Sequence, residues 1–196
     1  MLTFVAAVFF LIVTPGPGVL STAGVGSAFG ARAGIRYVAG LFVGNNLVIL
    51  AVISGLAALV LALPALRIVL SVASTAYLLY LAVRIATAGA KIAFIEAAHR
   101  PGIWDGIALQ AINPKAYAVN TALFSGFAFL PDAAATEAVV KLVILNAIWL
   151  PIHIAWLGAG VALRRLDLAD RTQRAINIAM ALSMLAVVGL ALFSLR

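Results

Sequence analysis

Two places in this chain combine a helix-capping residue with proline. Thr14 is followed by Pro15-Gly16-Pro17-Gly18, and Asn113 is followed by Pro114, Lys115 and Ala116. Threonine and asparagine side chains accept hydrogen bonds from the first N–H groups of a helix, and proline suits the first helical position. Each segment therefore predicts a new helix N-terminus. The free N–H groups and the positive dipole end of such a terminus favour an anion.

Lys115 adds a formal positive charge beside the second of these helix starts. An unpaired ion within a long apolar stretch is costly if that stretch crosses a membrane. We therefore expect the ammonium to lie in a cavity and to bind a substrate carboxylate. Other readings stay open: the side chain snorkels to an interface or caps a loop, or it is neutral or purely structural.

Other polar residues interrupt apolar stretches at two further places. Asn45 and Asn46 are adjacent, whereas Asn146, Trp149 and His153 are spaced by three and four residues and so share one helical face. These groups are candidates to bind the ammonium or the polar side chain of a substrate. The alternative is that they join helices by hydrogen bonds, with His153 as a packing residue and not a proton carrier.

The composition places these residues in a membrane protein. Of the 196 residues, 65% are hydrophobic and 10% are charged, and the mean hydropathy is +1.19. A soluble domain carries roughly 25% charged residues. An all-α integral membrane protein is the fold class that this composition indicates.

Six apolar segments are long enough to cross a bilayer, which takes roughly 20 residues of helix. They run from Met1 to Gly30, Tyr37 to Leu63, Ile68 to Ala88, Gly106 to Leu130, Leu142 to Leu163 and Ala175 to Leu195. Their apolar runs are continuous, which favours helices over a barrel. The first segment lacks a basic residue before its apolar run and is too long for a signal peptide, so we treat it as a span.

The net charge of +7 encodes orientation. Nine of the 13 basic residues lie in the first, third and fifth connections, and three lie on the opposite side. The nine are Arg32, Arg36, Arg84, Lys91, Arg100, Arg164, Arg165, Arg171 and Arg174, and the three are Arg67, Lys141 and Arg196. By the positive-inside rule, both termini face outward. A nucleic-acid partner is not expected.

The two interrupted spans occupy corresponding positions in the two halves of the chain. Thr14 and Asn113 lie 99 residues apart, and the same offset nearly superposes the second span on the fifth. We expect a single transporter domain over residues 1–196, built from repeats at about 1–88 and 102–196. Because three is odd, the second repeat is inverted, a pattern typical of secondary transporters. The predicted fold is thus six transmembrane helices in two inverted three-helix repeats, with helices 1 and 4 broken.

The residues resemble those of the LysE/RhtB family of amino-acid exporters. The resemblance rests on the two broken segments, on Gly40 and Gly44, on the stretch Ala76-Tyr77-Leu78-Leu79-Tyr80-Leu81, and on Trp149-Leu150-Pro151. It implies proton-motive-force-dependent efflux of amino acids or their derivatives. Family members commonly carry an acidic residue after the second-span glycine, where this chain has Asn45. All six acids, namely Glu96, Asp105, Asp132, Glu137, Asp167 and Asp170, are expected in connections or at span ends.

We therefore expect a secondary exporter of amino acids or their derivatives in the bacterial inner membrane, with a small-solute or ion channel as the alternative. The expected substrate site comprises Thr14, Pro15, Gly16, Pro17, Gly18, Asn45, Asn46, Asn113, Pro114, Lys115, Ala116, Asn146 and His153. With two histidines and no cysteine, the sequence predicts no enzyme, cofactor or metal site. The expected partners are the substrate and the lipid bilayer, and a homodimer stays open.

Overall fold

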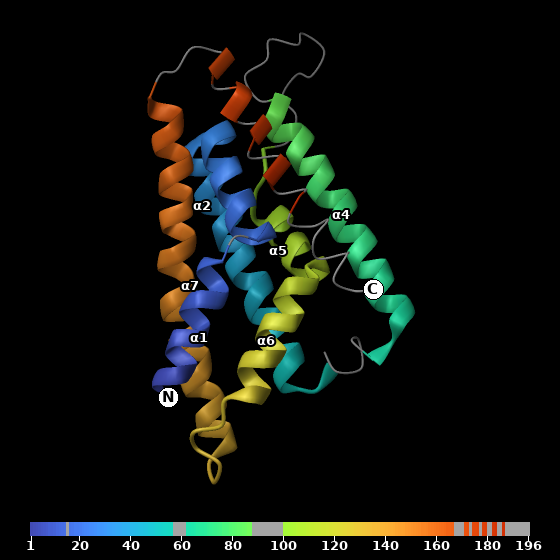
Figure 1. Cartoon of the computed structure of the whole chain (residues 1–196), viewed down its shortest axis with the longest axis vertical. Coiled ribbons are helices and arrows are strands. Elements are labelled where there is room, and N and C mark those ends of the chain that lie inside the picture. The colour runs from blue at the N-terminus through green and yellow to red at the C-terminus, as the bar shows by residue number, and fades with distance from the viewer. Residues whose placement is uncertain are drawn as a thin grey trace.

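A computed structural model describes residues 1–14, 16–56, 62–87 and 100–166, together with ten separate positions between 171 and 186. Helix is the only regular secondary structure in these residues (Figure 1). The helices are α1 (Leu2–Val13), α2 (Pro17–Ile53), α4 (Pro64–Thr87), α5 (Ile103–Ile112), α6 (Pro114–Gly126) and α7 (Ala134–Arg165). The predicted all-helical class is confirmed for the described part of the chain.

Three helices are long and apolar enough to cross a membrane: Pro17–Ile53, Pro64–Val83 within α4, and Ala134–Arg165. Leu2–Val13 and Ile103–Ile112 are shorter apolar helices. The outer faces of the long helices expose large apolar side chains, including Leu47, Leu50, Ile68, Val72 and Val143. So large an exposed apolar surface suits contact with lipid.

The α2 helix folds back on itself at Gly30, whose φ of 81° lies in the left-handed region that favours glycine. The buried hydroxyl of Tyr37 donates a hydrogen bond of 3.0 Å to Oγ of Ser21. In a straight helix these residues would lie about 24 Å apart, since each residue rises about 1.5 Å. The two arms of α2 are therefore antiparallel, and Gly30 ends the first predicted span.

Both predicted interruptions are present. The first span divides into α1, which ends at Val13, and the first arm of α2, which begins at Pro17. The fourth divides into α5 and α6 at Asn113. Pro17 and Pro114 stand at the starts of α2 and α6, where the missing N–H of proline costs nothing. Proline thus starts a new helix at each break.

The predicted span boundaries need several corrections. The helix of the second span ends at Ile53, and residues 57–61 lie outside the described part of the chain. The third span begins earlier than predicted, at Pro64. The fourth starts at Ile103. Most of the predicted sixth span, Ala175 to Leu195, also lies outside the described residues.

The predicted fifth span corresponds to α7, which begins earlier than predicted, at Ala134. It therefore contains two charged residues that were predicted outside the span. Glu137 and Lys141 are both buried, and their charged groups lie 2.7 Å apart. Glu137 lies in the first turn of α7, so it keeps to the prediction that all acids lie in connections or at span ends, whereas Lys141 was assigned to a connection and lies within the helix. Mutual neutralisation one helical turn apart explains why this pair lies within an otherwise apolar helix.

The core is built around α2, which packs against α5 along its second arm. The backbones of these helices approach at Gly40 and Gly106. A Cβ at Gly40 would overlap the backbone of Ile103, and one at Gly106 would overlap the backbone of Tyr37 and Leu41. Glycine at both positions permits this close crossing, which holds the second helix break against α2.

Candidate functional site

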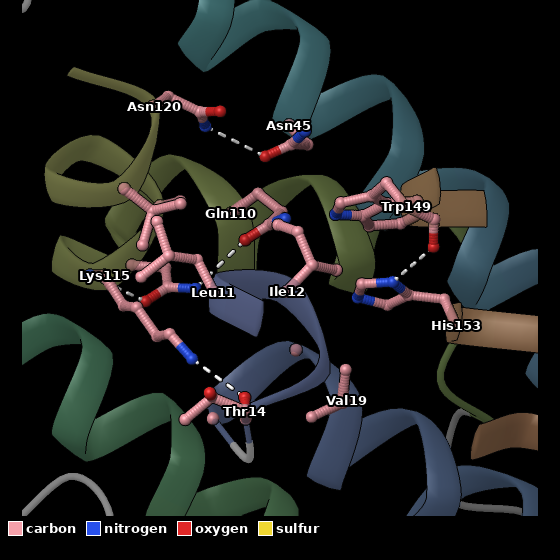
Figure 2. Close-up of a pocket in the computed structure, with 15 residues that line it drawn as sticks. Leu11, Ile12, Thr14, Val19, Asn45, Gln110, Lys115, Asn120, Trp149 and His153 are labelled. Atoms are coloured by element: carbon pink, nitrogen blue, oxygen red, sulfur yellow. Dashed lines mark hydrogen bonds between the residues drawn. The ribbon is translucent and has the colours of Figure 1, made fainter. Parts of the chain in front are cut away.

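The two helix breaks lie side by side. Thr14 is the C-cap of α1, and its backbone carbonyl accepts a hydrogen bond of 2.9 Å from Nζ of Lys115, in the first turn of α6. Figure 2 shows this bond at one edge of a pocket. The C-terminal end of a helix carries partial negative charge, which a lysine ammonium complements. The structure therefore brings together two segments about 100 residues apart.

The two new helix starts differ in how their N–H groups are capped. At α6, Oδ1 of Asn113 accepts a 3.1 Å hydrogen bond from the N–H of Lys115, and the Ala116 N–H bonds to the Asn113 carbonyl. At α2, the N-cap is Gly16, which makes no side-chain cap, and not the predicted Thr14, whose hydroxyl donates a hydrogen bond to the Phe10 carbonyl of α1 instead. The first turn of α2 thus keeps the N–H groups of Gly18 and Val19 for another acceptor.

A cavity of about 50 Å³ lies between the breaks. Fifteen residues line it: Leu11, Ile12, Thr14, Gly16, Gly18, Val19, Asn45, Gln110, Asn113, Lys115, Ala116, Val119, Asn120, Trp149 and His153. This lining includes two titratable side chains, Lys115 and His153, and no carboxylate. The cavity is therefore suited to a ligand that brings its own negative charge.

His153 occupies a fixed orientation on α7. Its ring stacks on Trp149 with centroids 3.5 Å apart, and Nδ1 lies 2.9 Å from the backbone carbonyl of Trp149. A carbonyl can only accept, so Nδ1 carries a hydrogen. In the neutral ring Nε2 then carries a lone pair, and this atom would lie 3.3 Å from a Cβ placed on Gly18. The α2 terminus and the imidazole acceptor thus face each other.

At the end of the pocket away from Thr14 in Figure 2, Nδ2 of Asn120 donates a 3.1 Å hydrogen bond to Oδ1 of Asn45. The remaining amide atoms, Nδ2 of Asn45 and Oδ1 of Asn120, are buried without a partner. If both amides were rotated, the unpartnered pair would still be one donor and one acceptor. This end of the pocket is neutral and retains unused hydrogen-bonding capacity.

Most of the predicted site residues gather here. Eight of the predicted residues line the cavity: Thr14, Gly16, Gly18, Asn45, Asn113, Lys115, Ala116 and His153. Pro17 and Pro114 are absent from its lining and stand at the helix starts, and Pro15 lies outside the described residues. Asn46 and Asn146 do not line the cavity either. Their amides pair reciprocally, at 3.2 and 2.8 Å.

Several lining residues were not predicted as site residues. Gln110 and Asn120 flank the second break, and Leu11, Ile12, Val19 and Val119 supply the apolar walls. Gln110 and Asn120 stand three residues before and seven after Asn113, a spacing close to whole helical turns. This spacing could have predicted from the sequence that both side chains lie on the same side as Asn113.

Comparison with known proteins identifies the family of this chain. The family described as LysE type translocator matches residues 9–195. The chain belongs to the LysE-type translocator family. Two of its curated relatives are cysteine/O-acetylserine efflux proteins of Salmonella choleraesuis and Salmonella typhimurium, each 34% identical over 155 residues, covering 78% of this chain and 77% of the relative. A protein of the same name from Salmonella paratyphi A is 32% identical over 157 residues. No solved structure shows a significant match.

The family match includes both halves of this LysE-type translocator, from within α1 to beyond α7. It therefore covers both helix breaks and the cavity between them. Membership establishes a translocator, and the cavity supplies the candidate position for what is translocated.

Proposed function

We propose that this chain exports a small amino acid or amino-acid derivative across the bacterial inner membrane, driven by the proton-motive force. The observation that carries the proposal is the convergence of both helix breaks on one cavity that contains Lys115. In secondary transporters, broken helices expose the polar ends of their backbone to a substrate near the membrane centre.

The substrate carboxylate is proposed to bind between Lys115 and the start of α2. A Cβ at Gly16 would lie 2.8 Å from Nζ of Lys115, so the ammonium is already beside this terminus. The N–H groups of Gly18 and Val19 have no side-chain cap there. Backbone N–H groups, a helix dipole and an ammonium together form a strong carboxylate site.

The far end of the cavity favours a neutral side chain. Asn45 and Asn120 offer one donor and one acceptor there, and the lining holds no carboxylate to pair with a cationic side chain. The relatives named above are efflux proteins for cysteine and O-acetylserine, both of which carry small uncharged side chains. We therefore propose small, neutral, polar amino acids as the substrate class.

The size of the cavity is consistent with one state of an alternating-access cycle. Its 50 Å³ would hold about four water molecules at roughly 12 Å³ each, which is less than a bound amino acid requires. Substrate entry would therefore require the two breaks to separate, with Lys115 leaving the Thr14 carbonyl for the carboxylate.

We also propose that the single domain consists of two inverted repeats with six spans. At the offset of 99 residues, Gly16 corresponds to Lys115, and a Cβ at Gly16 would meet the Lys115 side chain. The same offset brings Asn46 within one residue of its reciprocal partner Asn146. Equivalent residues contact each other where a two-fold axis passes, so both pairs support an axis through this region.

The proposed orientation places both termini outside. Figure 1 shows the end of α7 at the end of the bundle opposite the N-terminus, and the Gly30 turn of α2 lies beside the end of α7. Four arginines lie close in sequence to the Gly30 turn or to the end of α7: Arg32, Arg36, Arg164 and Arg165. Arg164 also donates a 3.0 Å hydrogen bond to the carbonyl of Ala28. By the positive-inside rule this end is cytoplasmic.

Counterflow in proteoliposomes tests the proposal and separates a carrier from a channel. Vesicles loaded with unlabelled L-cysteine, L-serine or L-lysine are diluted into a trace of the same labelled amino acid. A carrier for small neutral substrates gives transient accumulation of labelled cysteine or serine, and not of lysine. Reductant keeps cysteine reduced without affecting the chain, which contains no cysteine. Uptake without any counterflow would indicate a channel instead.

A further inference from the structure

We infer that His153 couples export to the proton gradient, because one lone pair on its Nε2 binds either the substrate ammonium or a proton. This inference rests on the proposed export function and names the coupling group within the same cavity. The buried ring is positioned by Trp149, through stacking at 3.5 Å and the hydrogen bond at Nδ1. These contacts leave Nε2 as the ring atom that can exchange a partner.

The position of Nε2 suits the ammonium of a bound amino acid. Nζ of Lys115 lies beside Gly16 and Nε2 of His153 lies beside Gly18. Two residues of backbone span at most about 7 Å. A carboxylate held by Lys115 and the α2 terminus would therefore place the adjacent ammonium within reach of His153.

Among the described residues that line the cavity, His153 is the titratable group that can accept a proton while Lys115 is already protonated. The other polar side chains that face the cavity are neutral: Thr14 from the α1 end, Asn45 from α2, Gln110 from α5, Asn113 at the α5–α6 break and Asn120 from α6. On α7, the paired Glu137 and Lys141 lie at least about 18 Å away along the helix, at about 1.5 Å per residue. Within the described lining, a proton entering the cavity has His153 as its acceptor.

Competition for this lone pair produces antiport. On the alkaline cytoplasmic side the ring is neutral, and Nε2 accepts a hydrogen bond from the substrate ammonium. On the acidic outer side a proton binds Nε2, which then has no acceptor and repels the ammonium as a like charge. The substrate leaves outward, and the proton is released from the same nitrogen after the site returns inward. No covalent bond other than N–H forms or breaks.

The test uses labelled L-cysteine and the full chain in proteoliposomes, with the membrane potential clamped to zero. For one proton per substrate, one pH unit, acid inside, should drive accumulation up to about tenfold in the wild type. His153→Gln keeps an acceptor near the position of Nε2 but does not titrate, so the variant should show weaker but measurable counterflow and accumulate substrate only about onefold. The matched control is His99→Gln, which changes the other histidine of the chain and should behave as the wild type.

Wild-type accumulation by His153→Gln would overturn the inference and leave the export function intact. Absence of wild-type counterflow for every amino acid tried would instead overturn the export function. A second measurement needs no variant at position 153. Wild-type counterflow with equal pH on both sides should fall as the pH is lowered from about 8 to about 4, because protons compete with the substrate ammonium for Nε2. Counterflow that is constant over this range would also overturn the inference.

Discussion

Lys115 and Thr14 are joined by a hydrogen bond from the lysine ammonium to the threonine carbonyl, across 101 residues of sequence. The bond connects the C-terminal end of α1 to the first turn of α6. It uses one of the three donors of the ammonium, so two face a carboxylate before the breaks separate and all three are available once Lys115 leaves the Thr14 carbonyl. The same contact that joins the two breaks therefore also orients the charge that we assign to substrate binding.

Gly16→Ala should disturb this contact without unfolding the protein. The new Cβ would lie 2.8 Å from Nζ and 3.0 Å from Cδ of Lys115, and the end of a flexible side chain moves at low cost. We expect normal membrane levels and weaker counterflow. Gly126→Ala is the control, because a Cβ there meets nothing within 4 Å. Equal counterflow by the two variants would show that the position of the ammonium is not critical.

Gly106→Ala should destabilise the fold, because its Cβ would overlap backbone atoms of Tyr37 and Leu41 that cannot rotate away. Overpacking of this kind costs about 1 to 3 kcal/mol or more. A lower melting temperature in detergent would report it. Gly158→Ala is the control, because Gly158 is exposed and a Cβ there meets nothing within 4 Å. Replacing a helical glycine by alanine raises the stability of a helix by up to about 1 kcal/mol. An unchanged melting temperature for Gly106→Ala would contradict the close crossing of α2 and α5.

Glu137→Gln should also lower the melting temperature. The Glu137 carboxylate pairs with Lys141 and accepts hydrogen bonds from the N–H groups of Phe129 and Leu130. Glutamine would leave the buried Lys141 ammonium, beside the rings of Phe4 and Phe129, with neutral acceptors alone, and would put an NH2 group where one carboxylate oxygen accepts a hydrogen bond.

Asp132→Asn removes an exposed carboxylate from the neighbouring loop and should leave the melting temperature almost unchanged. Equal effects of the two substitutions would show that the buried pair does not stabilise the start of α7. The comparison uses the same chemical change at a buried and an exposed position, so net charge is matched.

The orientation can be read with single cysteines, since the chain has none of its own. A membrane-impermeant maleimide should label Asp132→Cys in spheroplasts and Arg165→Cys only after permeabilisation. Both positions are exposed, so access depends on the side of the membrane. The reverse labelling pattern would invert the topology.

The helix breaks could be predicted from sequence because their causes are local. Asn113 caps the N–H of Lys115, and Pro114 follows at the first helical position. The Gly30 turn was predicted only as the end of an apolar segment. Its left-handed φ depends on the antiparallel packing of the two arms of α2, which hydropathy does not report.

The residues missing from the predicted site depend on helix rotation. Asn120 lines the cavity and Asn146 does not, although both are asparagines within apolar stretches. Which face of a helix meets the break follows from its packing against other helices. The Glu137–Lys141 pair was missed for a different reason. Two charged residues end a run of apolar sequence, so the predicted span began after them, whereas in the structure each charge neutralises the other.

The most direct test of the account is counterflow by Lys115→Met, which keeps the apolar stem and removes the ammonium. Losing a charge-assisted hydrogen bond costs about 1.5 to 3 kcal/mol, or roughly tenfold to more than a hundredfold in affinity. We expect at least a tenfold higher half-saturating concentration of L-cysteine at wild-type membrane levels. Lys115→Arg should recover little, because a planar guanidinium does not replace a compact ammonium between Thr14 and Gly16. Wild-type counterflow by well-folded Lys115→Met would contradict carboxylate binding at this site.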